Sequence, residues 1–146
     1  MATAKKILEN YENNVSFNWN DDHRAFNLIK IVREGIPYQY FKELAEKTPF
    51  KDKDWALYLR LSTRTLDRHR EENKRFQPKQ SERIIELMQL MNYGKIVFED
   101  TTNFFDWLNS KNIALGGISP MEVLDTSIGI NMIKDELGRI EHGILA

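Results

Sequence analysis

Hydroxyl and guanidinium side chains follow one another from Ser62 to Arg70 at spacings that suit binding to the anionic backbone of DNA. The stretch reads Ser-Thr-Arg-Thr-Leu-Asp-Arg-His-Arg, and Arg64 and Arg68 lie four residues apart on one face of a predicted helix. Hydroxyls and the amides of a helix start donate to phosphate oxygens, and an arginine binds a phosphate or the edge of a guanine. Because Leu66 is the only strongly apolar residue here, the helix should bury one narrow ridge. We expect DNA contacts from Ser62, Thr63, Arg64, Thr65, Arg68 and His69.

The residues before Ser62 supply the other half of a predicted helix-turn-helix. Residues 55–61 read Trp-Ala-Leu-Tyr-Leu-Arg-Leu, a short apolar helix, and Ser62 caps the polar helix that follows over residues 63–72. In a helix-turn-helix the first helix packs, and the second presents its N-terminal residues to the major groove. Residues 60–75 carry six Lys or Arg against three Asp or Glu. The alternative is a charged, solvated helix of an ordinary bundle. The turn lacks a glycine, and this weakens the evidence for a helix-turn-helix.

The residue types that carry enzyme or metal chemistry do not occur in useful combinations. The three histidines are far apart in the sequence, and no glycine-rich phosphate loop follows a strand. The carboxylate pairs Glu99-Asp100 and Asp135-Glu136 lie at predicted helix ends or faces, where carboxylates are usually solvated. We therefore expect no catalytic residue, no bound metal and no cofactor.

Helical spacing of apolar residues predicts an all-α, multi-helix bundle, and no strand alternation occurs. Asp21-Asp22 caps a first helix that Gly35 ends, and Pro37 begins a second helix that continues to about Lys47. The apolar stripe expected on the first helix consists of Phe26, Ile29, Ile31, Val32 and Ile36.

The second half should contain a long helix over residues 79–98, a shorter helix, a loop over residues 109–117, another short helix and a last helix. The predicted caps of the helices after the long one are Thr101 or Thr102, Ser119 and Thr126. Apolar residues of the last helix step by three or four and form one face: Ile130, Ile133, Leu137, Ile140 and Ile144. Gly138 lies in the middle of that helix, where it either admits a close neighbour or marks a bend.

Composition and charge limit the class of protein. The chain has 146 residues, of which 41% are hydrophobic, and no cysteine. No apolar run is long enough to span a membrane and the first residues lack a signal-peptide core, so we expect a cytoplasmic protein. The formal charge is +3 over residues 1–77 and −4 over residues 78–146, which allows an anion-binding first half and a different partner for the second half. We expect a mobile arm over residues 1–20, a helix-turn-helix region over 21–77 and a second helical domain over 78–146.

Motifs in the last third of the chain resemble a known family. They read Tyr-Gly-Lys-Ile-Val-Phe-Glu-Asp from Tyr93, Phe-Asp-Trp-Leu from Phe105, Ala-Leu-Gly-Gly-Ile-Ser-Pro from Ala114 and Leu-Gly-Arg-Ile-Glu-His-Gly from Leu137. Their order and spacing resemble the C-terminal toxin-binding domain of the Xre/MbcA/ParS antitoxins, the partners of RES-domain toxins. The run from Leu61 to His69 resembles the Xre-like helix-turn-helix that precedes this domain in the family. Gly94 departs from the family's frequent alanine, which we expect to loosen the long helix slightly.

This resemblance, over residues 35–146, implies an antitoxin of a type II toxin–antitoxin pair. The C-terminal domain would inhibit a RES-domain toxin by blocking its active site with the last helix and tail. Such toxins resemble ADP-ribosyl transferases and consume NAD, so NAD is a substrate of the toxin and not a cofactor of this chain. The implied toxin-binding residues are Arg139, Glu141, His142, Gly143, Ile144, Leu145 and Ala146.

The helix-turn-helix would repress the chain's own operon by binding operator DNA. Because palindromic operators are read by two-fold dimers, we expect a homodimer, with apolar surface of the long helix or near Trp55 contributing. The main alternative is a stand-alone helix-turn-helix transcription regulator without a toxin partner. A helical scaffold that binds no DNA is a third possibility.

Overall fold

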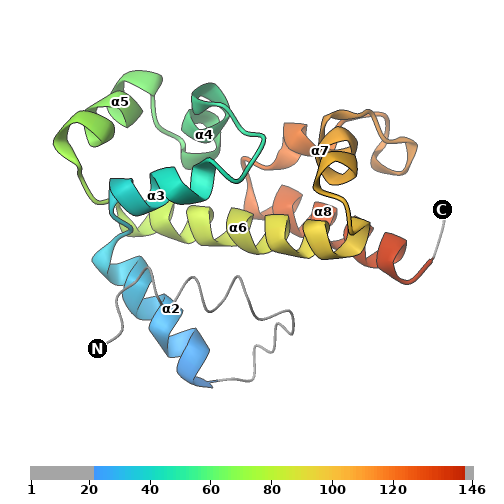
Figure 1. Ribbon diagram of the computed structural model, residues 1–146, viewed down its shortest axis with the longest axis horizontal. Helices are drawn as coiled ribbons and strands as arrows, with labels where there is room; N and C mark the ends of the chain where they lie inside the picture. Colours follow the sequence, from blue (N-terminus) through green and yellow to red (C-terminus); the bar gives the residue numbers. More distant parts are fainter. Residues whose placement is uncertain (1–21, 144–146) are drawn as a thin grey trace. The chain divides into compact units, whose positions relative to one another are not determined.

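The computed structural model describes residues 22–143 and confirms an all-α fold for them (Figure 1). These residues form seven α-helices and two short 3-10 helices, and none of them belongs to a β-strand. They divide into two compact units, and the boundary falls inside α6, between Ile85 and Glu86. No helix of this part of the chain is both long and apolar enough to cross a membrane. The arm expected over residues 1–20 lies outside the described residues.

The first unit is built from four short helices and the beginning of a long one. They are α2 (Asp22–Glu34), α3 (Tyr38–Ala45), α4 (Asp52–Leu59), α5 (Thr63–Glu72) and the start of α6 (Pro78–Phe98). Helix α5 contacts both α3 and α4. An aromatic cluster fills their core: the Phe41 ring meets Trp55 edge-on at a centroid distance of 5.0 Å and Phe76 at 4.9 Å. All three side chains are buried.

A buried serine ties the start of α6 to the segment between α2 and α3. The Ser81 hydroxyl accepts the Ile36 N–H at 2.9 Å and donates to the Phe76 carbonyl oxygen at 3.4 Å. The Phe76 N–H in turn donates to the Ile36 carbonyl oxygen at 2.9 Å. Gly35 ends α2 as predicted, with a φ of +86°. The polar groups of this buried junction are thereby satisfied, as a stable core requires.

Helix α4 begins earlier than the sequence predicted. It starts at Asp52 and not at Trp55, because the Asp54 carboxylate accepts the Lys51 N–H at 2.8 Å and closes the first turn. Acidic side chains also favour the positive end of the helix dipole. Pro37 lies just before the first helical residue of α3, and not at it.

The apolar stripe predicted for α2 is only partly correct. Ile31 and Ile36 are buried, but Phe26 is 70% exposed and Ile29 is 42% exposed. Leu28, which the stripe omitted, joins the core instead. The apolar residues of this short helix follow a 3.6-residue period only approximately, so the sequence did not show which side of the helix is buried.

The second unit continues α6 and adds α7, α8 and the two 3-10 helices. Their bounds are α7 (Thr101–Asn109), η1 (Ile113–Leu115), η2 (Pro120–Val123) and α8 (Ser127–Glu141). The predicted apolar face of α8 is confirmed over the described residues: Ile130, Ile133 and Leu137 are buried and Ile140 is half-buried. Ile144 lies outside the described residues.

Side-chain caps fix where the helices of the second unit begin. Thr126 caps α8 as predicted, and its hydroxyl accepts a backbone N–H at 2.9 Å. The prediction that Thr101 or Thr102 caps α7 was wrong. The cap is Asp100, whose carboxylate accepts the Asn103 N–H at 2.9 Å. A carboxylate at this position also complements the helix dipole, which a threonine does not.

The connection between α7 and α8 is more ordered than the loop predicted over residues 109–117. The Asn112 side chain accepts the Ala114 N–H at 2.9 Å and opens η1. Ser119 precedes η2, and its backbone N–H donates to the Glu122 carboxylate at 2.6 Å. This hydrogen bond and one from the Ser119 hydroxyl lower the pKa of Glu122 below its ordinary value. The short helix predicted after Ser119 is therefore present, but it is a 3-10 helix.

Glycines of the second unit differ in the space around them. A Cβ at Gly129 would collide with the Val123 carbonyl oxygen, so η2 and the start of α8 require glycine here. At Gly94 a Cβ would enter the Phe104 ring, which packs on this point of α6. Gly94 thus admits a packed ring, which was not expected. At Gly138 the nearest atom to a Cβ would be the Tyr93 hydroxyl at 3.5 Å, an ordinary contact.

The same substitution at two positions of α8 should therefore have opposite effects. We expect Gly129→Ala to lower the free energy of unfolding by about 1–3 kcal/mol, since the Val123 backbone cannot move aside easily. Gly138→Ala should raise it by up to about 1 kcal/mol, because alanine is the better helix former. Urea unfolding followed by circular dichroism measures both. Two changes of the same sign would contradict this account of α8.

Candidate functional sites

The first candidate site is the helix-turn-helix formed by α4 and α5. Arg60 takes the left-handed conformation with a φ of +55°, the role that a glycine often has in such turns. The Leu61 N–H donates to the Ala56 carbonyl oxygen at 2.9 Å and completes the end of α4. The Ser62 hydroxyl accepts the Thr65 N–H at 3.0 Å, which confirms the predicted cap. The turn is therefore tight without a glycine.

Two side chains hold α5 in place. Leu66 is the only residue of α5 that is buried, in agreement with the single ridge predicted from the sequence. The Arg70 guanidinium donates to the Asp52 carboxylate at 2.7 Å and to the Tyr38 hydroxyl at 2.9 Å. It also lies 3.3 Å from the Asp67 carboxylate. The hydrogen bonds to Tyr38 and Asp52 raise the pKa of Arg70 above its ordinary value. Arg70 therefore joins α5 to α3 and α4.

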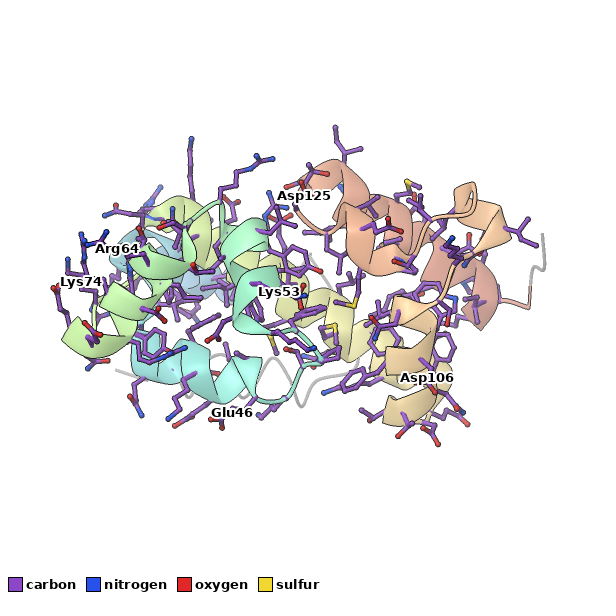
Figure 2. The ribbon with its side chains drawn as sticks, turned by 90° about the horizontal axis from the view of Figure 1, so that it is seen from above. Glu46, Lys53, Arg64, Lys74, Asp106 and Asp125 are labelled. Atoms are coloured by element: carbon purple, nitrogen blue, oxygen red, sulfur yellow. The ribbon has the colours of Figure 1, made fainter. Side chains whose placement is uncertain are left out.

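Arg64 and Arg68 lie on the exposed side of α5. Within residues 22–143 the structure gives neither of them a hydrogen bond or an ion pair. The hydrogen bond with Lys74 is the main cause that lowers the pKa of Glu72, and the charge of Arg68 is a lesser one. Figure 2 shows the Arg64 side chain projecting outward at the edge of the first unit. Both guanidinium groups are thus available to an anionic partner.

The three hydroxyls at the start of α5 are not equivalent. The Ser62 hydroxyl donates to the Thr65 hydroxyl at 2.8 Å while it also caps the helix. The Thr65 hydroxyl accepts that bond and keeps its own proton for another acceptor. Thr63 is exposed at the first helical position, where backbone N–H groups also point outward.

His69 has contacts inside the first unit that the sequence did not predict. Its ring stacks on Phe76 at a centroid distance of 4.8 Å and an interplanar angle of 10°. Its Nδ1 lies 2.9 Å from the Thr65 carbonyl oxygen, so Nδ1 carries the proton and donates. These contacts orient His69, and Nε2 remains as the atom that could accept a further bond.

The second candidate site is the C-terminal end of α8. Arg139 is exposed, and its Nη1 donates to the Glu136 carboxylate at 2.7 Å. Glu136 is buried, and its side chain is only 8% exposed. A buried carboxylate without a partner is costly, and this pairing fixes the guanidinium of Arg139 beside Glu136. His142 and Gly143 are exposed at the helix end, where Gly143 has a φ of +69°.

Glu141 lies beside a residue of α6. Its carboxylate is near enough to the Tyr93 hydroxyl to act on the pKa of that group. Burial, and then the nearby negative charge of Glu141, raise the pKa of Tyr93 above its ordinary value of 10. Tyr93 and Glu136 were both missed as positioning residues, because their contacts depend on how helices pack. The remaining predicted toxin-binding residues, Ile144, Leu145 and Ala146, lie outside the described residues.

The described residues contain no group of three or more His, Asp or Glu side chains that could hold a metal ion. The two sites therefore offer binding groups: guanidinium and hydroxyl groups on α5, and a mixed charged surface at the end of α8.

Two family models match consecutive parts of the chain. Residues 28–89 match the antitoxin Xre-like helix-turn-helix domain. Residues 94–143 match the antitoxin Xre/MbcA/ParS C-terminal toxin-binding domain. The first match contains α4 and α5, and the second contains α7, α8 and the described C-terminal residues.

Similar proteins include antitoxins from three bacteria. The chain is 32% identical to "Antitoxin Xre" of Yersinia enterocolitica over 87 residues, which is 59% of each chain. It is 26% identical to "Antitoxin Xre" of Photorhabdus laumondii over 121 residues, 82% of each chain. It is also 26% identical to "Prs ADP-ribosylating antitoxin" of a Sphingobium species over 127 residues, 81% of this chain and 80% of that one. The chain thus spans about three fifths of the Yersinia relative and most of the other two.

The contact between Tyr93 and Glu141 gives a test of the geometry of the second site. We expect Glu141→Gln to lower the pKa of Tyr93 toward 10 without reaching it, because the negative charge is lost and burial remains. Carbon-13 NMR of the tyrosine ring carbons, assigned with Tyr93→Phe, measures this pKa. Asp135→Asn, an exposed change on the same helix, should leave it unchanged. A Tyr93 pKa that does not respond to Glu141→Gln would refute the contact.

Proposed function

The chain belongs to the Xre/MbcA/ParS antitoxins, which are not enzymes, and we propose that it neutralises a RES-domain toxin by covering the entrance of that toxin's active site. Residues 94–143 match a toxin-binding domain, which implies that the chain has a toxin as its partner. In this proposal NAD is consumed by the toxin and is bound by no group of the antitoxin.

The observation that carries this proposal is the arrangement at the end of α8. Arg139 and Glu141 are both exposed, yet Arg139 donates to the Glu136 carboxylate at 2.7 Å and Glu141 lies beside the Tyr93 hydroxyl. Side chains that are already ordered lose less entropy when a partner binds them. Together with His142 and Gly143, they form a polar tip that would enter the mouth of the toxin's site.

We further propose that α5 binds the operator of the chain's own operon. Arg64 and Arg68 would contact phosphates or guanines, with Thr63, Thr65 and the amides of the helix start on neighbouring phosphates. Ser62 would act mainly as the cap that places these groups, and His69 as a contact oriented by its own unit.

A two-fold operator requires a homodimer, for which the first unit offers exposed apolar side chains. Trp55 is buried and leaves no surface for a partner, whereas Leu57 on the same helix is 59% exposed. Phe26 and Ile29 of α2 are also exposed. We propose that a second copy covers these side chains. A stand-alone regulator would not require a toxin-binding domain, so the match over residues 94–143 favours the antitoxin role.

The DNA proposal predicts a specific change in salt dependence. Arg64→Ala with Arg68→Ala should weaken binding to the operator and lower the slope of log K against log salt by about one unit per lost phosphate contact. Lys111→Ala is the control. It removes an exposed cation of the second unit, away from α5, so the slope should remain. Equal slopes for the wild type and the double variant, in a folded protein, would remove α5 as the recognition helix.

The toxin proposal predicts that the tip of α8 is needed for inhibition. We expect a variant with Arg139→Ala and Glu141→Ala that lacks residues 144–146 to inhibit NAD consumption about tenfold less well or worse, a loss of about 1.4 kcal/mol. The variant keeps the half-buried Ile140 but leaves the Glu136 carboxylate without its partner, so circular dichroism must first show that α8 stays helical. Binding to operator DNA is the internal control and should persist. Full inhibition by this variant would show that another surface blocks the toxin.

A further inference from the structure

The outer face of α8 carries apolar side chains that the core of the second unit does not use. Ile128 is 82% exposed and Met132 is 37% exposed. They are one helical turn apart and point away from the buried face formed by Ile130, Ile133 and Leu137. Single exposed apolar side chains are common on proteins, but here two of them lie on one line of a helix.

That line continues into the tip of α8. Starting at Ile128, steps of four, three, four and three residues reach Met132, Asp135, Arg139 and His142, and all five are exposed. Such steps follow one face of an α-helix, and the face extends for about 21 Å at 1.5 Å per residue. We name these five residues the outer stripe. It is apolar in its first two turns and charged or polar in its last two.

The tip alone is too small for a stable interface. A specific protein–protein interface buries about 800 Å² on each partner and involves about 20–30 residues a side. The proposed toxin-binding residues, Arg139 and residues 141–146, are seven in number, so the toxin must contact further residues of the chain. Interfaces place apolar anchors at their centre and polar groups at the rim. The outer stripe offers both kinds of group, apolar at one end and polar at the other, and it lies wholly within the matched toxin-binding domain.

We propose that the toxin seats an apolar groove on Ile128 and Met132, and that this contact anchors the complex while the tip covers the active site. This inference rests on the proposed function, and it assigns affinity and inhibition to different ends of α8. The partner surface is therefore apolar opposite the first two turns of the helix and lies beside the mouth of the toxin's site.

The test replaces both anchors by glutamate and measures affinity by calorimetry. The probe is a catalytically inactive form of the RES-domain toxin from the adjacent reading frame. Ile128→Glu with Met132→Glu should weaken binding about tenfold or more, since a charge would enter an apolar contact. Because Ile128 lies in the first turn of α8, a glutamate there suits the helix dipole and should not unfold the chain. If the double variant melts below the wild type, Ile128→Ser alone repeats the test with little loss of core contact.

Two controls separate the apolar contact from other effects. Ile128→Leu with Met132→Leu keeps the apolar surface and should bind within about twofold of the wild type. Ile113→Glu places the same charge on an exposed apolar residue of the second unit outside α8, and toxin binding should persist.

The outcomes distinguish this inference from the proposed function. Weak binding by the glutamate variant, with strong binding by both controls, supports the anchor. If the wild type binds and inhibits the toxin and the glutamate variant does so equally well, the anchor is wrong and the proposed function stands. If the wild type does not bind the toxin at all, the proposed function fails, and the anchor fails with it.

Discussion

Leu66 and Arg70 hold α5 in place. Because these two side chains occupy only a narrow part of the helix, the rest of its surface stays exposed. Leu66 is fully buried, and such burial contributes about 1.5–3 kcal/mol. The Arg70 pair with Asp52 is about half exposed, so it adds at most about 1 kcal/mol. The apolar contact therefore supplies most of the energy, and the guanidinium sets the direction of the helix. Because one ridge suffices, Arg64 and Arg68 face outward without a partner in their own unit.

Helix α8 is also held on one side and exposed on the other, but its buried face is broad. Ile130, Ile133 and Leu137 fill the core, and Gly129 lets the helix start lie directly against the backbone of η2. Glu136 extends the buried face with a carboxylate that must be neutralised, and Arg139 supplies the charge from the exposed side. A helix fixed so firmly on one face presents a rigid opposite face, which lowers the entropic cost of binding a partner there.

What the sequence predicted, and what it did not, follows from how local each interaction is. The caps at Ser62 and Thr126 depend on a side chain and an amide three residues away, so they could be read directly. The start of α4 and the Asp100 cap were missed because neighbouring residues offered competing acceptors. The contacts of Arg70 with Asp52 and of Glu141 with Tyr93 join distant parts of the chain, and no local pattern reports them. The motifs still identified the family, because family residues can be matched without knowing what positions them.

The uneven charge of the chain explains why its two proposed roles occupy different units. Residues 1–77 carry a formal charge of +3, which suits DNA, and residues 78–146 carry −4, which DNA would repel. An enzyme that consumes NAD has to bind a pyrophosphate, so its site presents cationic groups or amide donors. A unit with surplus carboxylates complements such a site and is steered toward it. No single surface could satisfy both partners, since a charge that attracts one repels the other, and the chain therefore places the arginines of α5 and the carboxylates around α8 on separate units.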